Sequence, residues 1–278
     1  MIKAYIQILR PINLLITLAC IIVTSLILNQ FSYDLIPLIF TILCLTAFAN
    51  IINDLFDYQI DQTNRPDRPL PSGNITYKSA IILSILLFLI SIFIILIYNF
   101  NSITQILIFC INLPLIIFYT PFFKKIPLLG NIIVAFILSM VFIVTTFYLE
   151  GDINQIIPPA TLAFIMMLTR EVVKDIADIK GDSIMKINTF PVLYGINNSI
   201  RLVLGLIFFL ILTTFYFASY YNRIYIFSVI LLVDIPLLYF SIKLFKNRTA
   251  SYCKYLEKVL KLLTIFGVIV IYLATAII

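Results

Sequence analysis

The feature that most constrains this chain is a series of apolar runs, each roughly 20 residues long. Hydrophobic residues make up 62% of its 278 positions, and charged residues only 12%. A helix of that length crosses the hydrocarbon core of a bilayer, which is about 30 Å thick. Solid apolar blocks also argue against a transmembrane barrel, whose strands alternate polar and apolar residues. The sequence therefore predicts an all-α integral membrane protein.

The apolar runs predict nine transmembrane helices in one bundle, with residues 1–278 forming a single domain. The first run resembles a signal sequence, but no small-residue cleavage site follows it, so we interpret it as the first helix. The two long polar connections, 54–78 and 174–198, follow the second and sixth runs, and we expect them to form a cytoplasmic cap over the bundle. The nine runs lie near residues 12–30, 35–53, 79–98, 102–119, 130–149, 156–173, 199–217, 222–241 and 259–278.

The distribution of basic residues predicts the orientation of this bundle. Of the 19 lysines and arginines, all except Arg223 fall on the side that carries the N-terminus, whereas Asp34, Glu150 and Asp152 fall on the other side. Because cytoplasmic loops are rich in basic residues, we expect a multi-pass protein of the cell membrane with its N-terminus and both long connections in the cytoplasm. This topology explains the net charge of +6 without nucleic acid. Membrane lipids are the expected surroundings, and we predict no obligate protein partner.

Three carboxylates at helical spacing follow the second apolar run. Asp54, Asp57 and Asp61 stand at i, i+3 and i+7, so a helix places them on one face, and Asn53 joins that face one turn before Asp57. Like charges on one stripe repel each other, so the pattern indicates a cation bound between them. The chain has no histidine, which excludes histidine catalysis and ligation. The remaining oxygen ligands suit Mg²⁺ or Ca²⁺.

The same spacing recurs after the sixth run, at Asp175, Asp178 and Asp182. Two carboxylate clusters that each hold a cation would clamp a diphosphate, because Mg²⁺ completes its shell with phosphate oxygens. A diphosphate at the mouth of an apolar bundle implies a diphosphate with an apolar tail. Its metal-assisted departure leaves an allylic carbocation that a second substrate captures. The basic and aromatic side chains available to complete this site are Arg65, Arg68, Lys124, Lys174 and Tyr119.

A further motif, Arg68-Pro69-Leu70-Pro71-Ser72-Gly73, follows the first acidic cluster. Together with segment 53–61 and the pair Asp178 and Asp182, it resembles the two signatures of the UbiA superfamily of intramembrane prenyltransferases. The resemblance extends over essentially the whole chain and implies nine helices, two cytoplasmic cap loops and bound Mg²⁺. The Mg²⁺ ligands that the resemblance implies are Asn53, Asp54, Asp57, Asp61, Asp178 and Asp182.

Within that superfamily, the stretches 170–182 and 124–131 look most like the archaeal-type digeranylgeranylglyceryl phosphate synthases. That family transfers a geranylgeranyl group from geranylgeranyl diphosphate to the free hydroxyl of geranylgeranylglyceryl phosphate, a step of ether-lipid synthesis. Asp175 fits this subgroup, so we expect all six aspartates of the two motifs to be catalytic. A phosphorylated, lipid-like acceptor needs further cationic contacts, and the residues available for them are Arg170, Lys180 and Lys186.

Three alternatives remain open. A prenyltransferase for an aromatic quinone precursor, such as hydroxybenzoate or naphthoate, would use the same diphosphate clamp, although many such enzymes carry Arg where this chain has Tyr58. A cation transporter would place acids near the bilayer midplane, where only Asp234 fits, and we interpret Asp234 as a bundle-facing acid at a helix kink. A CDP-alcohol phosphotransferase would carry Gly and Ala in the first motif, where this chain has Leu55, Phe56 and Tyr58.

Overall fold

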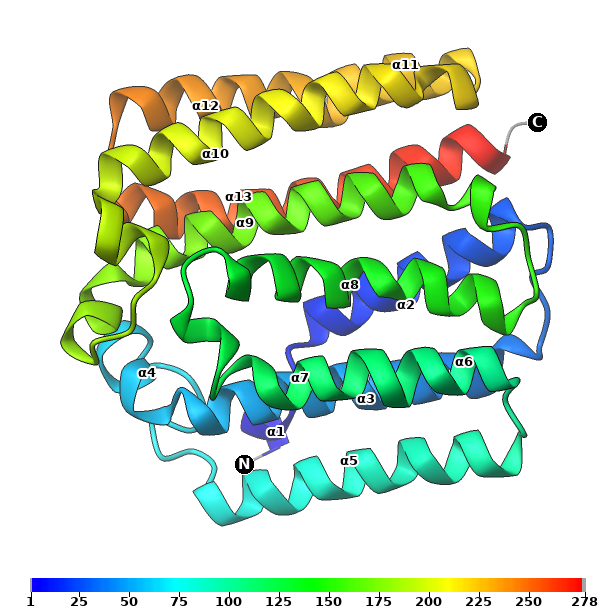
Figure 1. Cartoon of the computed structure of the whole chain (residues 1–278), viewed down its shortest axis with the longest axis horizontal. Coiled ribbons are helices and arrows are strands. Elements are labelled where there is room, and N and C mark those ends of the chain that lie inside the picture. Colours follow the sequence, from blue (N-terminus) through cyan, green and yellow to red (C-terminus); the bar gives the residue numbers. More distant parts are fainter. Residues whose placement is uncertain (1, 277–278) are drawn as a thin grey trace.

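The computed structural model describes residues 2–276, and all regular elements in that range are helices (Figure 1). The α-helices are α1 (Ile2–Ile8), α2 (Pro11–Ile27), α3 (Leu35–Phe56), α4 (Tyr58–Asn64), α5 (Tyr77–Ile97), α6 (Ser102–Ile106), α7 (Leu113–Tyr119), α8 (Leu129–Tyr148), α9 (Ile157–Ile184), α10 (Phe190–Tyr216), α11 (Arg223–Val229), α12 (Ile235–Lys246) and α13 (Ala250–Ala276). Short 3₁₀ or π segments are η1 (Leu107–Asn112), η2 (Phe123–Lys125), η3 (Ile153–Gln155), η4 (Phe217–Tyr220) and η5 (Ile230–Asp234).

Among the described residues, seven helical stretches are long and apolar enough to cross a membrane, or eight if α1 and α2, which meet at 51°, form one bent span. The all-helical, multi-pass architecture is therefore confirmed. The count of nine stays a prediction, because the expected span at 156–173 falls on α9. There Arg170, Glu171 and Lys174 interrupt the apolar run.

Some helices of the bundle are surrounded by other helices, and others lie at its edge. α9 lies inside the bundle and packs against α8, α10 and α13, while α3 packs against α5. Figure 1 shows α5 at one edge of the bundle and α10 with α12 at the opposite edge. On α5 only four residues are buried, and Phe93 is 64% exposed. Such an apolar outer surface is stable in contact with lipid tails. Unlike water, lipid tails provide no hydrophobic driving force for burying apolar side chains.

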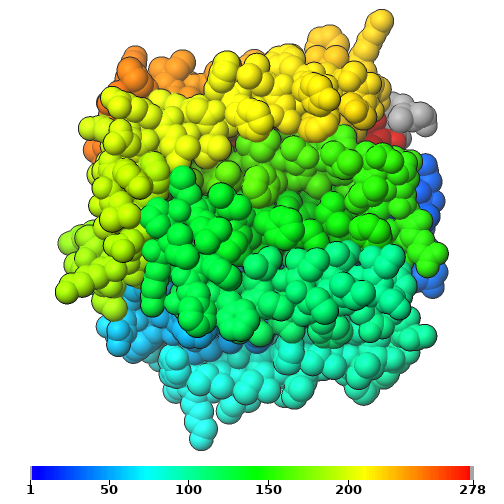
Figure 2. All heavy atoms as spheres, viewed as in Figure 1, coloured from blue at the N-terminus to red at the C-terminus, as the bar shows by residue number. Residues whose placement is uncertain are grey.

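The two long polar connections of the chain lie at one end of the bundle, together with the connection between α7 and α8. In Figure 1, α4, the end of α9 and the connection between α7 and α8 all lie toward the left. The space-filling view in Figure 2 shows the corresponding blue, yellow-green and green regions at that same end. The two long connections predicted to form the cap therefore meet there. That this end faces the cytoplasm stays a prediction.

Candidate active site

The first acidic motif lies where α3 gives way to α4. The spacing of the aspartates predicts helix across this motif, and the structure has helix on both sides of an interruption at Asp57 (φ −83°, ψ 4°). Hydrogen bonds from the Asp57 amide to the Asn53 carbonyl (2.9 Å) and from the Asp61 amide to the Asp57 carbonyl (2.8 Å) carry the chain across this interruption. Asp54, Asp57 and Asp61 are only 3%, 5% and 4% exposed. Carboxylates this deeply buried need partners.

Arginine side chains supply these partners at both ends of the motif. Arg68 donates from Nη1 to Asp54 Oδ1 (3.1 Å) and to Asp61 Oδ2 (2.6 Å), so these two carboxylates lie on one side of the chain. Arg10 also pairs with Asp54. Burial raises the pKa of Asp61 above its ordinary value, although the charge of Arg68 opposes that rise.

Lys124 neutralises the central carboxylate of the motif. Its Nζ lies 2.5 Å from Asp57 Oδ1, and Asn53 donates to Asp57 Oδ2 at 3.2 Å. Burial alone lowers the pKa of Lys124, but the charge of Asp57 outweighs it and the pKa is raised. Gly130 lets η2 lie directly on α8, because a Cβ there would stand 3.1 Å from the Phe123 carbonyl oxygen.

The second acidic motif lies on α9, which is unbroken over this stretch, so its predicted helical spacing is confirmed. Asp178 Oδ2 accepts a hydrogen bond from Arg65 Nη2 at 3.0 Å. Asp175 Oδ2 accepts one from Asn131 of α8 at 2.8 Å. Asp182 is 2% exposed. The motif is therefore held from two directions, by α8 and by the segment after α4.

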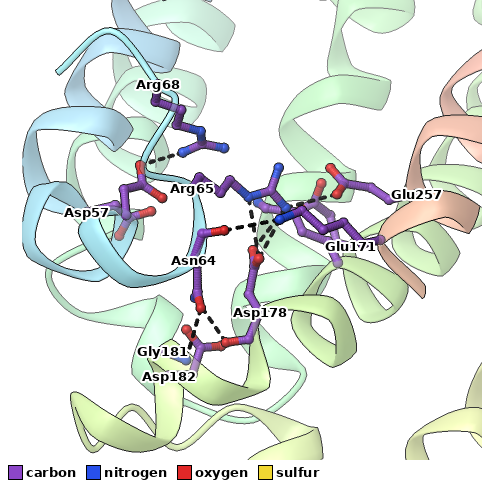
Figure 3. Close-up of polar contacts among 12 residues, drawn as sticks. Asp57, Asn64, Arg65, Arg68, Glu171, Asp178, Gly181, Asp182 and Glu257 are labelled. Atoms are coloured by element: carbon purple, nitrogen blue, oxygen red, sulfur yellow. Dashed lines mark hydrogen bonds and ion pairs between the residues drawn. The ribbon is translucent and has the colours of Figure 1, made fainter. Parts of the chain in front are cut away.

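The end of α4 ties the two acidic motifs together (Figure 3). Arg65 pairs through Nη2 with Asp178 and with Glu257 of α13 (2.8 Å). Asn64 donates to the Asp178 carbonyl (3.0 Å) and accepts from the Gly181 amide (3.0 Å). Burial alone lowers the pKa of Arg65, but the charges of Asp178 and Glu257 outweigh it and raise it. The two motifs, more than 100 residues apart in sequence, thus form one site.

The Gly181→Ala substitution should weaken this contact, because the added Cβ would overlap the Asn64 carboxamide. We expect overpacking to lower the free energy of unfolding by about 1–3 kcal/mol. Thermal unfolding in detergent measures this change. Gly205→Ala on α10 is the matched control, since its Cβ would meet no atom within 4 Å. Equal melting temperatures for the two variants would contradict the tight approach of α4 to α9.

A cavity of about 240 Å³ opens beside the joined motifs. Its wall on α3 reaches from Asn53 back to Ile42, roughly 16 Å at 1.5 Å per residue, and becomes apolar toward Ile42 and Leu45. The aspartates of the two motifs do not line the cavity. Arg65 and Arg68, which pair with Asp178 and Asp54, do line it, so these cations lie between the carboxylates and the cavity. The charged residues that line the cavity are Arg10, Arg65, Arg68, Arg170, Lys174, Lys261, Glu171 and Glu257.

The structure brings most of the predicted site residues together. Tyr119 and Lys174 line the cavity with Arg65, Arg68 and Arg170. Lys124 pairs with Asp57 of the first motif and does not line the cavity. By contrast, two lysines proposed to bind the acceptor are exposed and do not line the cavity. These are Lys180 and Lys186.

Four charged residues of the cavity were not assigned from the sequence. Arg10 directly precedes the first apolar run, and Glu171 lies in the stretch 170–182. Glu257 and Lys261 stand at i and i+4 beside and within the last apolar run. Ionisable residues in membrane helices usually mark a functional site, so that signal could have identified the last two.

The oxygen ligands of this site suit Mg²⁺. Within residues 2–276, no three carboxylate or thiol side chains converge closely enough to surround a metal ion. Such convergence is not required, because Mg²⁺ typically binds one or two carboxylates and takes its other ligands from water and phosphate. Asp54 and Asp57 on one side and Asp178 on the other supply hard, anionic donors that now bind cationic side chains. The donor set therefore fits a hard divalent cation.

Comparison with known sequences finds one family and relatives that share a single name. Residues 13–274 match the UbiA prenyltransferase family. The digeranylgeranylglyceryl phosphate synthase of Methanosphaera stadtmanae is 31% identical, over 93% of this chain and 94% of that protein. The enzyme of the same name from Saccharolobus solfataricus is 32% identical, over 96% of this chain and 95% of that protein.

Solved structures share the fold. A structure of digeranylgeranylglyceryl phosphate synthase superposes with a TM-score of 0.73 at 23% identity, covering 99% of this chain and 98% of the other. A UbiA homolog from Archaeoglobus fulgidus, solved bound to GPP and Mg²⁺, superposes with a TM-score of 0.70 at 18% identity, covering 96% and 99%. At these identities the comparison establishes the helical architecture.

Proposed function

Because this chain belongs to the UbiA prenyltransferase family and is a membrane-bound prenyltransferase, we propose that it makes an ether lipid. In this proposal it transfers a geranylgeranyl group from geranylgeranyl diphosphate to geranylgeranylglyceryl phosphate. The observation that carries the proposal is the cavity, which joins a long apolar wall to a cationic end beside the two tied acidic motifs. The names of relatives about one third identical over most of their length support the same acceptor.

The donor diphosphate would lie at the cationic end of the cavity. Arg65, Arg68 and Lys124 are positioned to donate hydrogen bonds to phosphate oxygens, since they already pair with carboxylates there. Mg²⁺, when bound, would neutralise negative charge that develops on the departing diphosphate. Lys174 and Tyr119 would complete this end. The ligands we propose for Mg²⁺ are Asn53, Asp54, Asp57, Asp61, Asp178 and Asp182, with Asp175 as the remaining catalytic carboxylate.

The prenyl chain would lie along the apolar wall. Leu45, Val134 and Val141 belong to this wall, and they would exclude water from the allylic cation that forms when the diphosphate leaves. The aromatic face of Tyr119 would stabilise that cation. The acceptor hydroxyl then attacks the allylic carbon, forms the ether bond and gives its proton to the released diphosphate. We also propose that this end of the bundle faces the cytoplasm, because all basic residues except Arg223 lie on that side.

The acid that fitted a cation transporter does not belong to this site. Asp234 is 3% exposed, as expected for a bundle-facing acid. One of its oxygens accepts a hydrogen bond from the Thr214 hydroxyl at 3.1 Å, and the residue does not line the cavity beside the motifs. It lies in the π segment η5, which produces the local irregularity expected there.

The proposal is tested by offering the purified protein three acceptors in parallel. With radiolabelled geranylgeranyl diphosphate and Mg²⁺, we expect label in the product of geranylgeranylglyceryl phosphate and none on hydroxybenzoate or dihydroxynaphthoate. The reason is that an aromatic carboxylate carries one negative charge, whereas the cavity presents six basic and two acidic side chains. Transfer to an aromatic acceptor alone would overturn the proposed acceptor but leave the prenyltransferase assignment intact.

A further inference from the structure

Lys261 is a charged side chain inside the last apolar helix. It lies on α13, roughly 16 Å along the helix from Ala250 at 1.5 Å per residue, and it lines the cavity. Within residues 2–276 it forms no ion pair or hydrogen bond. Glu257, one turn earlier on the same helix, is already bound by Arg65 and Arg170. A lysine so placed in a membrane helix is expected to meet an anion.

Arg170 of α9 lies beside Lys261 with an unused donor. Its Nη1 donates to Glu171 Oε1 at 3.0 Å, and its Nη2 lies 3.5 Å from Glu257 Oε1. Its Nε is buried and has no hydrogen-bond partner among the described residues. A buried donor without an acceptor is unfavourable unless a ligand or water supplies one. Arg170 can therefore bind a further oxygen atom without releasing either carboxylate.

Arg10 brings a third cation to the same place. It lies at the break between α1 and α2 in the left-handed region (φ 55°, ψ 68°), which is an uncommon conformation for a residue with a side chain. A hydrogen bond from Asn50 Nδ2 to the Leu9 carbonyl (3.1 Å) holds this break in place. Arg10 shares its partner Asp54 with Arg68, so Asp54 remains neutralised when Arg10 turns to another anion.

The local charge balance calls for an anionic ligand. Lys261 lines the cavity together with Arg170, Arg10 and Glu257. Arg10 and Arg170 already have carboxylate partners, whereas Lys261 has none among the described residues. Of the cavity's cations, Arg10, Arg65 and Arg68 therefore pair with motif aspartates, whereas Arg170 and Lys261 do not.

We propose that Lys261, Arg170 and Arg10 form a subsite for the phosphate monoester of the acceptor, separate from the residues that hold the donor diphosphate. This inference rests on the proposed function. A phosphate monoester carries a charge of about −1.5 to −2 at pH 7 and three acceptor oxygens. The unpaired ammonium of Lys261, the unpartnered Nε of Arg170 and Arg10, which can turn from Asp54, would bind these oxygens. The subsite places an anionic headgroup beside the apolar wall and between α2, α9 and α13. It therefore selects acceptors that carry a phosphate and a lipid chain.

The substitution Lys261→Gln tests the subsite because it removes the unpaired charge and keeps a polar side chain of similar length. We expect the KM for geranylgeranylglyceryl phosphate to rise roughly tenfold or more, while the KM for geranylgeranyl diphosphate stays unchanged. Lys261→Arg, which retains the charge, should restore the acceptor KM. Lys258→Gln is the matched control, since Lys258 lies on the same helix and is exposed.

A second measurement does not depend on turnover. With EDTA present, binding of geranylgeranylglyceryl phosphate to the wild-type protein in detergent should exceed binding of unphosphorylated geranylgeranylglycerol, and both Lys261→Gln and Arg170→Gln should remove that difference. A raised KM for the diphosphate instead of the acceptor would overturn the subsite, as would unchanged constants in all variants. If the wild-type protein does not prenylate the phosphorylated acceptor, the proposed function itself is contradicted. If the wild-type protein turns over normally and the acceptor KM of the variants is unchanged, only the subsite is contradicted.

Discussion

Replacing Asp178 with Asn should reduce the rate of prenyl transfer by roughly 10²- to 10³-fold. Asp178 is the carboxylate through which the two acidic motifs meet, and its charge binds Arg65 at 3.0 Å. The substitution removes a negatively charged ligand from the proposed Mg²⁺ site but leaves the shape of the side chain nearly unchanged. Because Arg65 keeps its ion pair with Glu257 (2.8 Å), we expect the variant to remain folded. Initial rates at saturating substrate concentrations measure the effect.

Asp67→Asn is the control for this experiment. Asp67 lies between Arg65 and Arg68 in the same connection, but it is exposed. Loss of its charge should therefore leave the rate unchanged. Full activity of Asp178→Asn would show that this carboxylate has no part in the reaction. A melting temperature close to that of the unsubstituted protein would establish that any loss of rate is chemical and not a consequence of unfolding.

Removal of divalent metal should have an effect of similar size. After treatment with EDTA, we expect prenyl transfer to fall by about three orders of magnitude, because metal coordination contributes several kcal/mol to stabilising developing charge. Addition of Mg²⁺ should restore the rate. In the structure Arg68 and Lys124 pair with carboxylates of the first motif. Without a metal, these two cations would have to neutralise both the aspartates and the diphosphate.

The metal requirement is measured by titrating Mg²⁺ into the EDTA-treated protein. Asp57→Asn should shift this titration to higher Mg²⁺ concentration, because it removes one of the proposed ligands. Glu150→Asn offers a matched control, since Glu150 lies at the opposite end of the bundle and is exposed. Turnover that persists at full rate in EDTA would overturn the assignment of Mg²⁺.

Local patterns in the sequence were sufficient for the class of fold. Apolar runs long enough to span a bilayer predicted the all-helical membrane architecture, since each helix satisfies its own backbone hydrogen bonds in lipid. The periodicity of Asp175, Asp178 and Asp182 likewise predicted their common helix face on α9. Two predictions about the extent of individual helices were less exact. The helix across the first motif is interrupted at Asp57, and the charged residues of α9 leave the ninth span unconfirmed.

Hydropathy and helical spacing are properties of adjacent residues, so they were enough to predict apolar helices with two acidic motifs at their ends. Which charges meet depends instead on contacts between distant helices. Arg65 reaches Glu257 across 192 residues, and Arg10 reaches Asp54 across 44. Such contacts depend on how α2, α4, α9 and α13 pack, which no local pattern specifies. The same packing leaves Lys261 beside Arg170 without a carboxylate of its own, and so creates the proposed place for a second phosphate.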